Sequence, residues 1–322
     1  MAEPRPIILD CDPGHDDAVA MMLALAHPAI DLLGITTVGG NQTLDKITRN
    51  AQSVLVASGR DDVPVYAGSD RPLVRRVEIA PDIHGDSGLD GVELPEPTRP
   101  VEDQHGVQFI IDTVMAAEPD TITLVATGPL TNIAIAARLE PRIVERVREV
   151  VVMGGGYHEG NWTAVAEFNI WVDPEAAHIV FDAAWPLTMV GLDLTHQALA
   201  TVEVEEKVRA IGSPLADFFL GLMAFFRSTY QEQQGFTDPP VHDPCTIAYL
   251  IDPEIVQTQN VPLAIELRGE HTVGMTVADF RSPAPADCRH QVATRLDHAG
   301  FWALVVDAIK VLSEGDQGSS RG

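Results

Sequence analysis

Short apolar runs alternate with segments of helical periodicity over roughly the first 190 residues of the chain. The apolar runs are 6–9 (PIIL), 30–38 (IDLLGITTV), 63–68 (VPVYAG), 121–127 (TITLVAT), 148–156 (REVVVMGGG) and 186–194 (PLTMVGLDL). Between them, segments such as 16–27 and 106–118 place apolar residues near positions i, i+3 and i+4, as a helix does. Continuous apolar runs are typical of parallel strands buried on both faces. The alternation therefore predicts an α/β fold in which helices cover both faces of an open, mostly parallel sheet.

The pattern changes at about residue 201 to consecutive helical segments, 203–212 and 213–234. A helix is then expected from about Asp243, two strand-like runs near 261–279, and a final helix from Ala299. No linker rich in Gly, Ser and Pro separates these additions from the sheet. We therefore expect one domain over 1–313 with C-terminal helical additions, and a flexible polar tail over 314–322.

Charge and cysteine content narrow the possible functions. The 322 residues include 21 basic and 47 acidic side chains, which gives a formal charge of −26. Such a chain repels phosphate backbones and anionic membranes, so neither nucleic acid nor a membrane is expected as a partner. The three cysteines lack the spacing of a zinc site or a disulfide framework. With no signal-peptide pattern at the start and no apolar run of about 18 residues, we expect a cytoplasmic protein.

Four aspartates follow the first apolar run within eight positions: Asp10, Asp12, Asp16 and Asp17. Clustered carboxylates repel one another, and oxygen-rich clusters suit hard cations such as calcium or magnesium. An EF-hand is excluded because His15 stands where glycine is needed and Met21 where the bidentate glutamate belongs. A phosphate-binding loop is also excluded, because the segment lacks the GK[ST] signature of such loops. An aspartyl-phosphate enzyme with Asp10 or Asp12 as nucleophile stays open, as does simple capping of the next helix by some of these residues.

Other polar or glycine-rich segments follow later strands of the predicted sheet. They are 39–41 (GGN), 127–128 (TG) and 154–156 (GGG). In open α/β sheets, ligands bind at the carboxyl ends of the strands. We therefore expect these segments and the aspartates to share one edge of the sheet.

Seven motifs occur in order and together resemble the nucleoside hydrolases, specifically the inosine-uridine preferring type. They are DCDPGHDDA (10–18), TTVGGN (36–41), IHGDSGLDG (83–91), ATGPLTN (126–132), VMGGG (152–156), NWTAVAEFNIWVDPEAA (161–177) and PPVHDPC (239–245). The resemblance implies a calcium-dependent N-glycosidase that splits ribonucleosides into ribose and free base. It also implies the open α/β core of that family and a homo-oligomer, either a dimer or a tetramer.

The resemblance further implies the roles of individual residues. Calcium would be held by Asp12, Asp17, the backbone carbonyl of Thr127, and Asp243. The ribose would be bound by Asp16, Asn41, Asn161, Glu167 and Asn169.

Two histidines are candidates for the side of the site that faces the base. By resemblance, His242 is the acid that protonates a purine leaving group, and His84 is a contact to the base. His15 receives no catalytic role. The end of the aromatic helix, near Tyr230 and Gln234, and Phe236 just beyond it are hypothesised to close over the base.

These residues suit the chemistry of glycoside hydrolysis. Departure of the base gives an oxocarbenium-like transition state, which carboxylates and amide oxygens stabilise. A metal-bound water would be the nucleophile, and Asp12 would be its general base. If calcium binds the sugar diol, the enzyme should strongly prefer ribose over 2′-deoxyribose. The VHDP motif favours inosine and uridine as substrates. A metal-dependent phosphatase and a non-catalytic calcium- or nucleoside-binding protein remain alternative functions.

Overall fold

The computed structural model describes residues 3–319 and contains one large sheet of eight strands. The strand order is β3-β2-β1-β4-β5-β6-β10-β7. All neighbours pair in parallel except β7, which runs antiparallel to β10 at one edge. In sequence order the strands are β1 (Arg5–Cys11), β2 (Ile30–Thr37), β3 (Val65–Ala67), β4 (Thr123–Ala126), β5 (Glu149–Met153), β6 (Leu187–Val190), β7 (Val256–Asn260) and β10 (His290–Leu296).

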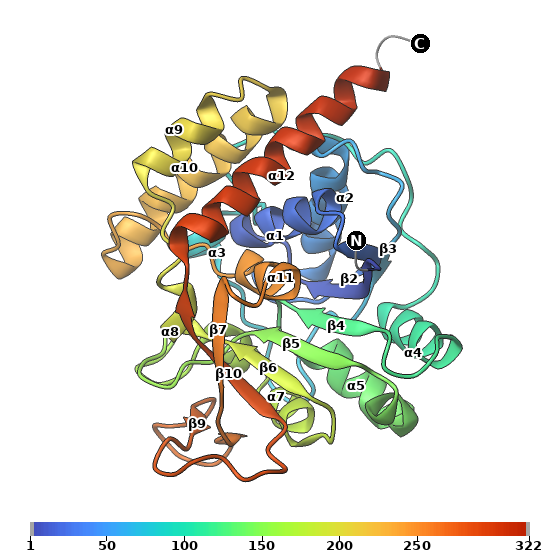
Figure 1. Cartoon of the computed structure of the whole chain (residues 1–322), viewed down its shortest axis with the longest axis vertical. Helices are drawn as coiled ribbons and strands as arrows, with labels where there is room; N and C mark the ends of the chain where they lie inside the picture. The colour runs from blue at the N-terminus through green and yellow to red at the C-terminus, as the bar shows by residue number, and fades with distance from the viewer. Residues whose placement is uncertain (1–2, 320–322) are drawn as a thin grey trace.

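Helices cover both faces of this sheet and bury two apolar cores (Figure 1). One face carries α1 (His15–Ala26), α2 (Leu44–Ala57), α9 (Val202–Arg209), α10 (Pro214–Gln234), α11 (Pro244–Ile251) and α12 (His298–Ser319). The other face carries α4 (Gly106–Ala116), α5 (Thr131–Leu139), the 3₁₀ helix η1 (Pro141–Glu145) and α7 (Pro174–Asp182). Strands β4 and β5 are buried almost throughout, as expected of strands with helices on both sides. The predicted three-layer α/β fold is confirmed.

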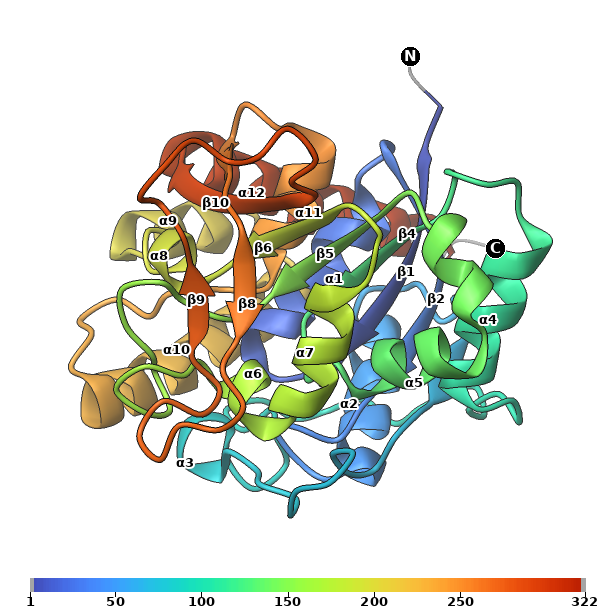
Figure 2. The same cartoon turned by 90° about the horizontal axis from the view of Figure 1, so that it is seen from below.

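Short elements line the ends of the strands or lie outside the main layers. These are α3 (Pro81–His84), α6 (Phe168–Val172), α8 (Leu192–Thr195), β8 (Leu263–Ile265) and β9 (Thr276–Ala278). Strands β8 and β9 form a separate antiparallel pair beside α7, which is visible in Figure 2. Within the described residues, no helix is long and apolar enough to cross a membrane.

The C-terminal part of the sheet differs from the sequence expectation. The strand-like runs near 261–279 contain β8 and β9, which pair with each other outside the main sheet. Strands β7 and β10 complete the main sheet, yet their sequences VQTQN and HQVATRL are largely polar and were not predicted as strands. The cause is that β7 is an edge strand with mostly exposed residues, so it needs no continuous apolar run.

The last helix also extends further than expected. Helix α12 continues to Ser319 and so includes residues 314–319, which were expected to belong to a flexible tail. The remaining residues of that predicted tail, 320–322, lie outside the described residues.

Candidate active site

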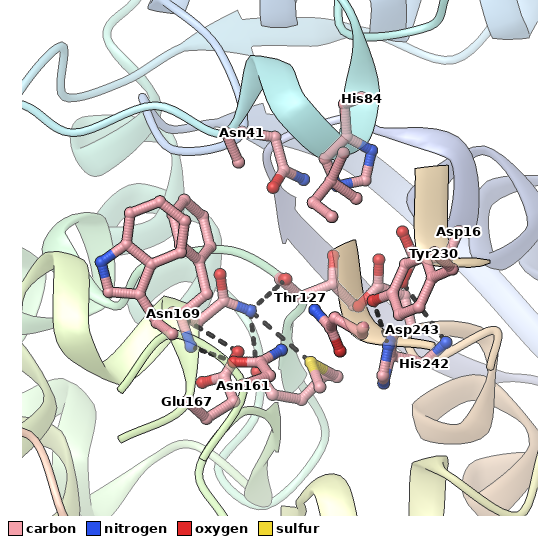
Figure 3. Close-up of a pocket in the computed structure, with 16 residues that line it drawn as sticks. Asp16, Asn41, His84, Thr127, Asn161, Glu167, Asn169, Tyr230, His242 and Asp243 are labelled. Carbon is pink, nitrogen blue, oxygen red and sulfur yellow. Dashed lines mark hydrogen bonds between the residues drawn. The ribbon is translucent and has the colours of Figure 1, made fainter. Parts of the chain in front are cut away.

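A cavity opens where β1, β2, β4 and β5 end, at the carboxyl edge of the parallel sheet. Nine of the eleven predicted site residues line it: Asp16, Asn41, His84, Thr127, Asn161, Glu167, Asn169, His242 and Asp243. Figure 3 shows Asn41 and His84 on one side, Asn161 and Glu167 opposite, and Asp16, Asp243, His242 and Tyr230 together on a third side. The other two, Asp12 and Asp17, are joined to Asn41 by hydrogen bonds.

The aspartate loop takes its shape from the turn between β1 and α1. Strand β1 ends at Cys11, and α1 begins at His15 after the Pro-Gly pair at 13–14. The Asp17 carboxylate accepts a hydrogen bond of 3.0 Å from the backbone amide of Gly14 and so caps the helix. Asp16 and Asp17 therefore lie in the first turn of α1, where the helix dipole stabilises negative charge.

Three buried carboxylates, those of Asp16, Asp17 and Asp243, offer oxygens that lie within 4.8 Å of one another. Burial and the neighbouring carboxylate of Asp17 raise the pKa of Asp16 to about 7. Burial and the charges of Asp16 and Asp17 raise the pKa of Asp243 well above its usual value. Charged carboxylates this close are stable only with a cation or a proton between them. The cluster therefore fits a metal ion.

Asp12 lies outside this group of three but keeps one oxygen available. Its Oδ2 accepts a hydrogen bond of 2.7 Å from the backbone amide of Asn41. Its Oδ1 is buried and has no hydrogen-bond partner among the described residues. Burial and the charge of Asp17 raise the pKa of Asp12. Gly40 permits this close packing, because a Cβ at that position would overlap the Asp12 carboxylate.

Thr127 follows β4 and connects the carboxylates to the polar side chains on α6. Its hydroxyl donates a hydrogen bond of 2.7 Å to Asp17. Its backbone carbonyl accepts one of 2.8 Å from the side-chain amide of Asn169. A carbonyl oxygen has two lone pairs, so this contact leaves one for the predicted metal ligation.

Glu167 is the N-cap residue of α6 and lies at the cavity wall. Its carboxylate accepts hydrogen bonds from the backbone amides of Gly155 (3.0 Å), Asn169 (2.9 Å) and Ile170 (3.1 Å). Burial nevertheless raises its pKa to about 7. The Asn161 side chain accepts a hydrogen bond of 2.9 Å from the amide of Phe168, which fixes it beside Glu167. This wall is polar and rigid, as recognition of hydroxyl groups requires.

His242 is buried and hydrogen-bonded at both ring nitrogens. Its Nδ1 lies 2.7 Å from the Thr195 hydroxyl and its Nε2 lies 2.7 Å from the Tyr230 hydroxyl. Burial, with a smaller effect of His196, lowers the pKa of His242 well below its usual value. The imidazole is therefore neutral and held in one orientation. Tyr230 was singled out from the sequence, whereas Thr195 was missed because α8 has no motif that marks it.

His84 lies on the opposite side of the cavity and is held by His15. The two Nδ1 atoms are 3.1 Å apart, and the rings stack with a centroid separation of 5.3 Å. Burial lowers the pKa of His84 well below its usual value and that of His15 to about 4. The contact joins residues 69 apart in the chain, so the sequence could not show it.

Two aromatic residues at the cavity were not assigned a role from the sequence. Trp162 and Phe168 both line it, and their rings meet edge to face at 5.0 Å. The Trp162 indole donates a hydrogen bond of 3.1 Å to Glu78, which accepts another of 3.1 Å from Trp171. Of the three residues expected to close over the base, Tyr230 and Gln234 line the cavity, and Phe236 is not among its lining residues.

Solved structures with this architecture define the class of protein. The structure of a purine-preferring ribonucleoside hydrolase from Gardnerella vaginalis matches with a TM-score of 0.90 and 33% identity, over 96% of this chain and 99% of that one. A plant nucleoside hydrolase matches with a TM-score of 0.88 and 29% identity, over 95% and 99%. Fold and site together therefore define an enzyme of the ribonucleoside hydrolase class. Ribonucleoside hydrolases are N-glycosidases.

Sequence comparison identifies the family. The model of the inosine-uridine preferring nucleoside hydrolases matches residues 7–303, and the chain belongs to this family. It is 57% identical to the inosine-uridine preferring nucleoside hydrolase of Crithidia fasciculata, over 97% of this chain and 99% of that one. It is 46% identical to the pyrimidine-specific ribonucleoside hydrolase RihB of Escherichia coli, over 96% and 98%. Family membership argues against the phosphatase alternative.

Proposed function

We propose that this protein is a calcium-dependent hydrolase that splits inosine, uridine and related ribonucleosides into ribose and free base. The observation that carries the proposal is the group of buried carboxylates, Asp16, Asp17 and Asp243, at one cavity with the polar wall of Asn161 and Glu167. The buried carboxylates suit a cation, and the polar wall suits the hydroxyl groups of a sugar. The names of the relatives cite inosine-uridine, pyrimidine and purine preferences, so family membership leaves the base preference open.

Calcium is the proposed ion because every candidate ligand is an oxygen atom. We assign Asp12, Asp17, Asp243 and the Thr127 carbonyl to it. The unpartnered Oδ1 of Asp12 and the mutual repulsion of the other carboxylates support this assignment. When bound, calcium supplies a positive charge that orients the ribose 2′ and 3′ hydroxyls and makes a bound water more acidic.

The chain's own residues account for the remaining steps at the sugar. Asp12 takes the proton of the attacking water, since its Oδ1 is buried beside the other carboxylates and has no hydrogen-bond partner among the described residues. Asp16 and Asn41 bind hydroxyls at the side of the carboxylates, and Asn161, Glu167 and Asn169 bind those at the opposite wall. As the bond from C1′ to the base breaks, positive charge develops on the ribose, and the surrounding carboxylates stabilise it.

The departing base receives its proton from His242 acting with Tyr230. The two side chains are hydrogen-bonded at 2.7 Å and both line the cavity. Because His242 is neutral at rest, it first takes up a proton from solvent. As negative charge develops on the base, that proton passes from His242 Nε2 through the Tyr230 hydroxyl to the base, which leaves both side chains neutral. The Thr195 hydroxyl holds the far side of the His242 ring at 2.7 Å and so orients it.

Incubation with inosine and uridine tests the proposal directly. Reducing sugar should appear, prolonged treatment with EDTA should abolish its release, and calcium should restore it. Release of phosphate from phosphomonoesters without nucleoside cleavage would contradict the proposal, as would full activity after exhaustive removal of the metal. A panel of kcat/KM values for inosine, adenosine, uridine and cytidine measures the base preference.

The sugar provides a second test of the same site. A 2′-deoxynucleoside leaves one metal position unfilled and a buried polar group without its partner. We expect kcat/KM for 2′-deoxyinosine to be at least about a hundredfold below that for inosine. Equal turnover of the two would show that the diol is not bound as proposed.

We further propose that the protein forms a dimer or tetramer and acts in the cytoplasm. The resemblance to the family supports the oligomer, and light scattering on the purified protein tests it.

A further inference from the structure

Asn50 is a buried residue of α2 that lies between two loops of the site. Its side-chain nitrogen donates a hydrogen bond of 3.1 Å to the backbone carbonyl of Pro13 and one of 2.9 Å to that of Ser87. Pro13 belongs to the aspartate loop, and Ser87 belongs to the loop that begins with His84. Because carbonyl oxygens only accept hydrogen bonds, both hydrogens of the Asn50 amide are used and the orientation of the side chain is fixed.

The contact with Pro13 acts on a proposed calcium ligand. The carbonyl of Pro13 and the amide of Gly14 belong to one peptide unit, and in a trans peptide these two groups point in opposite directions. By holding the carbonyl, Asn50 directs the N–H of Gly14 to the other side, where it donates a hydrogen bond of 3.0 Å to the Asp17 carboxylate. Gly14 also packs against His84, since a Cβ at Gly14 would lie 2.5 Å from Nδ1 of that ring. A turn of this peptide unit would therefore move both Asp17 and His84.

The contact with Ser87 acts in the same way on the His84 loop, residues 84–90. The carbonyl of Ser87 and the amide of Gly88 share a peptide unit, and the N–H of Gly88 donates a hydrogen bond of 3.3 Å to the carbonyl of Gly85. Gly88 has a φ of +88°, and a Cβ there would lie 2.8 Å from the side-chain nitrogen of Asn50, so this approach requires glycine. The turn that follows His84 is therefore closed against Asn50.

Other side chains of α2 hold the same stretch of chain without reaching the aspartate loop. Lys46 donates a hydrogen bond to the carbonyl of Asp86. Ser53 is also buried and lies about one turn beyond Asn50, and its hydroxyl donates a hydrogen bond of 2.8 Å to the carbonyl of Pro95. Among the described residues of α2, Asn50 is the one whose side chain contacts both loops. Ser53 thus provides a comparable buried contact that has no link to the proposed metal ligands.

We propose that Asn50 is a positioning residue that couples calcium binding to the placement of His84. This inference rests on the proposed function and concerns the same site. With Asn50 in place, the carboxylate of Asp17 and the imidazole of His84 are held in one geometry by a single side-chain amide. Without it, two buried carbonyls lack their donor, and the two peptide units are free to turn independently. Asn50 itself contacts neither the ion nor the substrate in this scheme.

Calcium titration of the full-length protein, after removal of bound metal, tests the coupling. Asn50→Leu keeps a side chain of similar size but removes both donors, and Ser53→Ala is the matched control. We expect the Kd for calcium, measured by calorimetry, to rise at least about tenfold in Asn50→Leu and to stay within about twofold in Ser53→Ala, although both variants should melt at lower temperature. An unchanged Kd in Asn50→Leu, or an equal rise in both variants, would overturn the inference alone. Absence of calcium binding to the unsubstituted protein would instead contradict the proposed function and the inference with it.

Hydrogen exchange of the backbone amides measures the coupling in the unsubstituted protein and decides the question if Asn50→Leu does not fold. Calcium should slow exchange by at least about threefold in residues 12–17 and also in the His84 loop, because Asn50 joins the two. Residues 93–96, which α2 holds through Ser53, should exchange at an unchanged rate and serve as the control. In Asn50→Leu, calcium should protect residues 12–17 alone. Protection confined to residues 12–17 in the unsubstituted protein would overturn the inference.

Discussion

Two regions of the cavity are built on opposite principles. The carboxylate region, comprising Asp12, Asp16, Asp17 and Asp243, gathers like charges in the protein interior. The histidine region, comprising the pair His15 and His84 and the pair Tyr230 and His242 on two sides of the cavity, consists of neutral groups that are hydrogen-bonded within each pair. Burial opposes charge in both regions, but the carboxylates also raise one another's pKa.

This difference separates two tasks. The carboxylate region is unstable without an added positive charge, so loss of any member changes the whole group. The hydrogen bonds of the histidine region are satisfied without a ligand. Its members are therefore expected to orient the base of the substrate and to supply its proton. We therefore expect substitutions among the carboxylates to affect every substrate, and substitutions among the histidines to affect substrates according to their base.

The largest effect is expected for Asp12→Asn. This change removes the proposed general base and one metal ligand but keeps the hydrogen bond from Asn41 possible. We expect kcat/KM to fall by about a thousandfold or more for inosine and uridine alike. Steady-state kinetics with saturating calcium measures this effect, and circular dichroism checks the fold. A fall in kcat/KM for only one of the two nucleosides would contradict the expectation that substitutions in the carboxylate region affect every substrate.

His242→Ala should show the selectivity of the other region. For inosine, whose base leaves poorly without a proton, we expect kcat to fall by about a hundredfold. For 4-nitrophenyl riboside the loss should be within about threefold, because a nitrophenolate needs no proton to leave. Thr195→Val, which removes only the far hydrogen bond to His242, should show the same pattern more weakly. Equal losses with both substrates would assign His242 a structural role.

The apo protein should lose stability as the pH rises. Burial raises the pKa of Asp10, Asp16 and Glu167 to about 7 each, above their values in the unfolded chain. The folded state therefore binds more protons than the unfolded state between about pH 4 and 7. The resulting stability is fully present below that interval and is lost as the pH rises through about 7.

Denaturant titrations at about pH 5.5, 6.5 and 7.5 measure this dependence. In EDTA, the free energy of unfolding should fall by about 1 kcal/mol per pH unit for each such group. Calcium at a hundred times its Kd should add about 2.7 kcal/mol near pH 7.5, because it binds the ionised carboxylates. A free energy of unfolding that rises with pH in EDTA would contradict the proposed electrostatics.

Most of the sheet and of the carboxylate region could be predicted from the sequence. Strands β1, β2, β4, β5 and β6 are buried and read as apolar runs, and the polar residues that follow them meet at one edge. Strands β7 and β10 could not be found in this way, because their polar residues lack that signal.

The histidine region depends on contacts between distant segments. Thr195 and His242 are 47 residues apart, and His15 and His84 are 69 apart. No local pattern marks such pairs, and the tautomer of a histidine depends on its partner. The resemblance to the family therefore indicated which residues belong to the site, whereas the structure was needed to see what holds them.

The smallest effect is expected at Glu78, which belongs to neither region. Its carboxylate accepts hydrogen bonds from the indoles of Trp162 and Trp171, and Trp162 lines the cavity. Glu78→Ala frees both indoles, and we expect KM to rise about two- to threefold with kcat unchanged, since a partly exposed hydrogen bond contributes about 0.5 kcal/mol. Glu78→Gln keeps an acceptor oxygen and should retain most of the affinity. A fall in kcat in Glu78→Ala would instead link this wall to the chemistry, so that the contrast between the two regions would no longer describe the whole site.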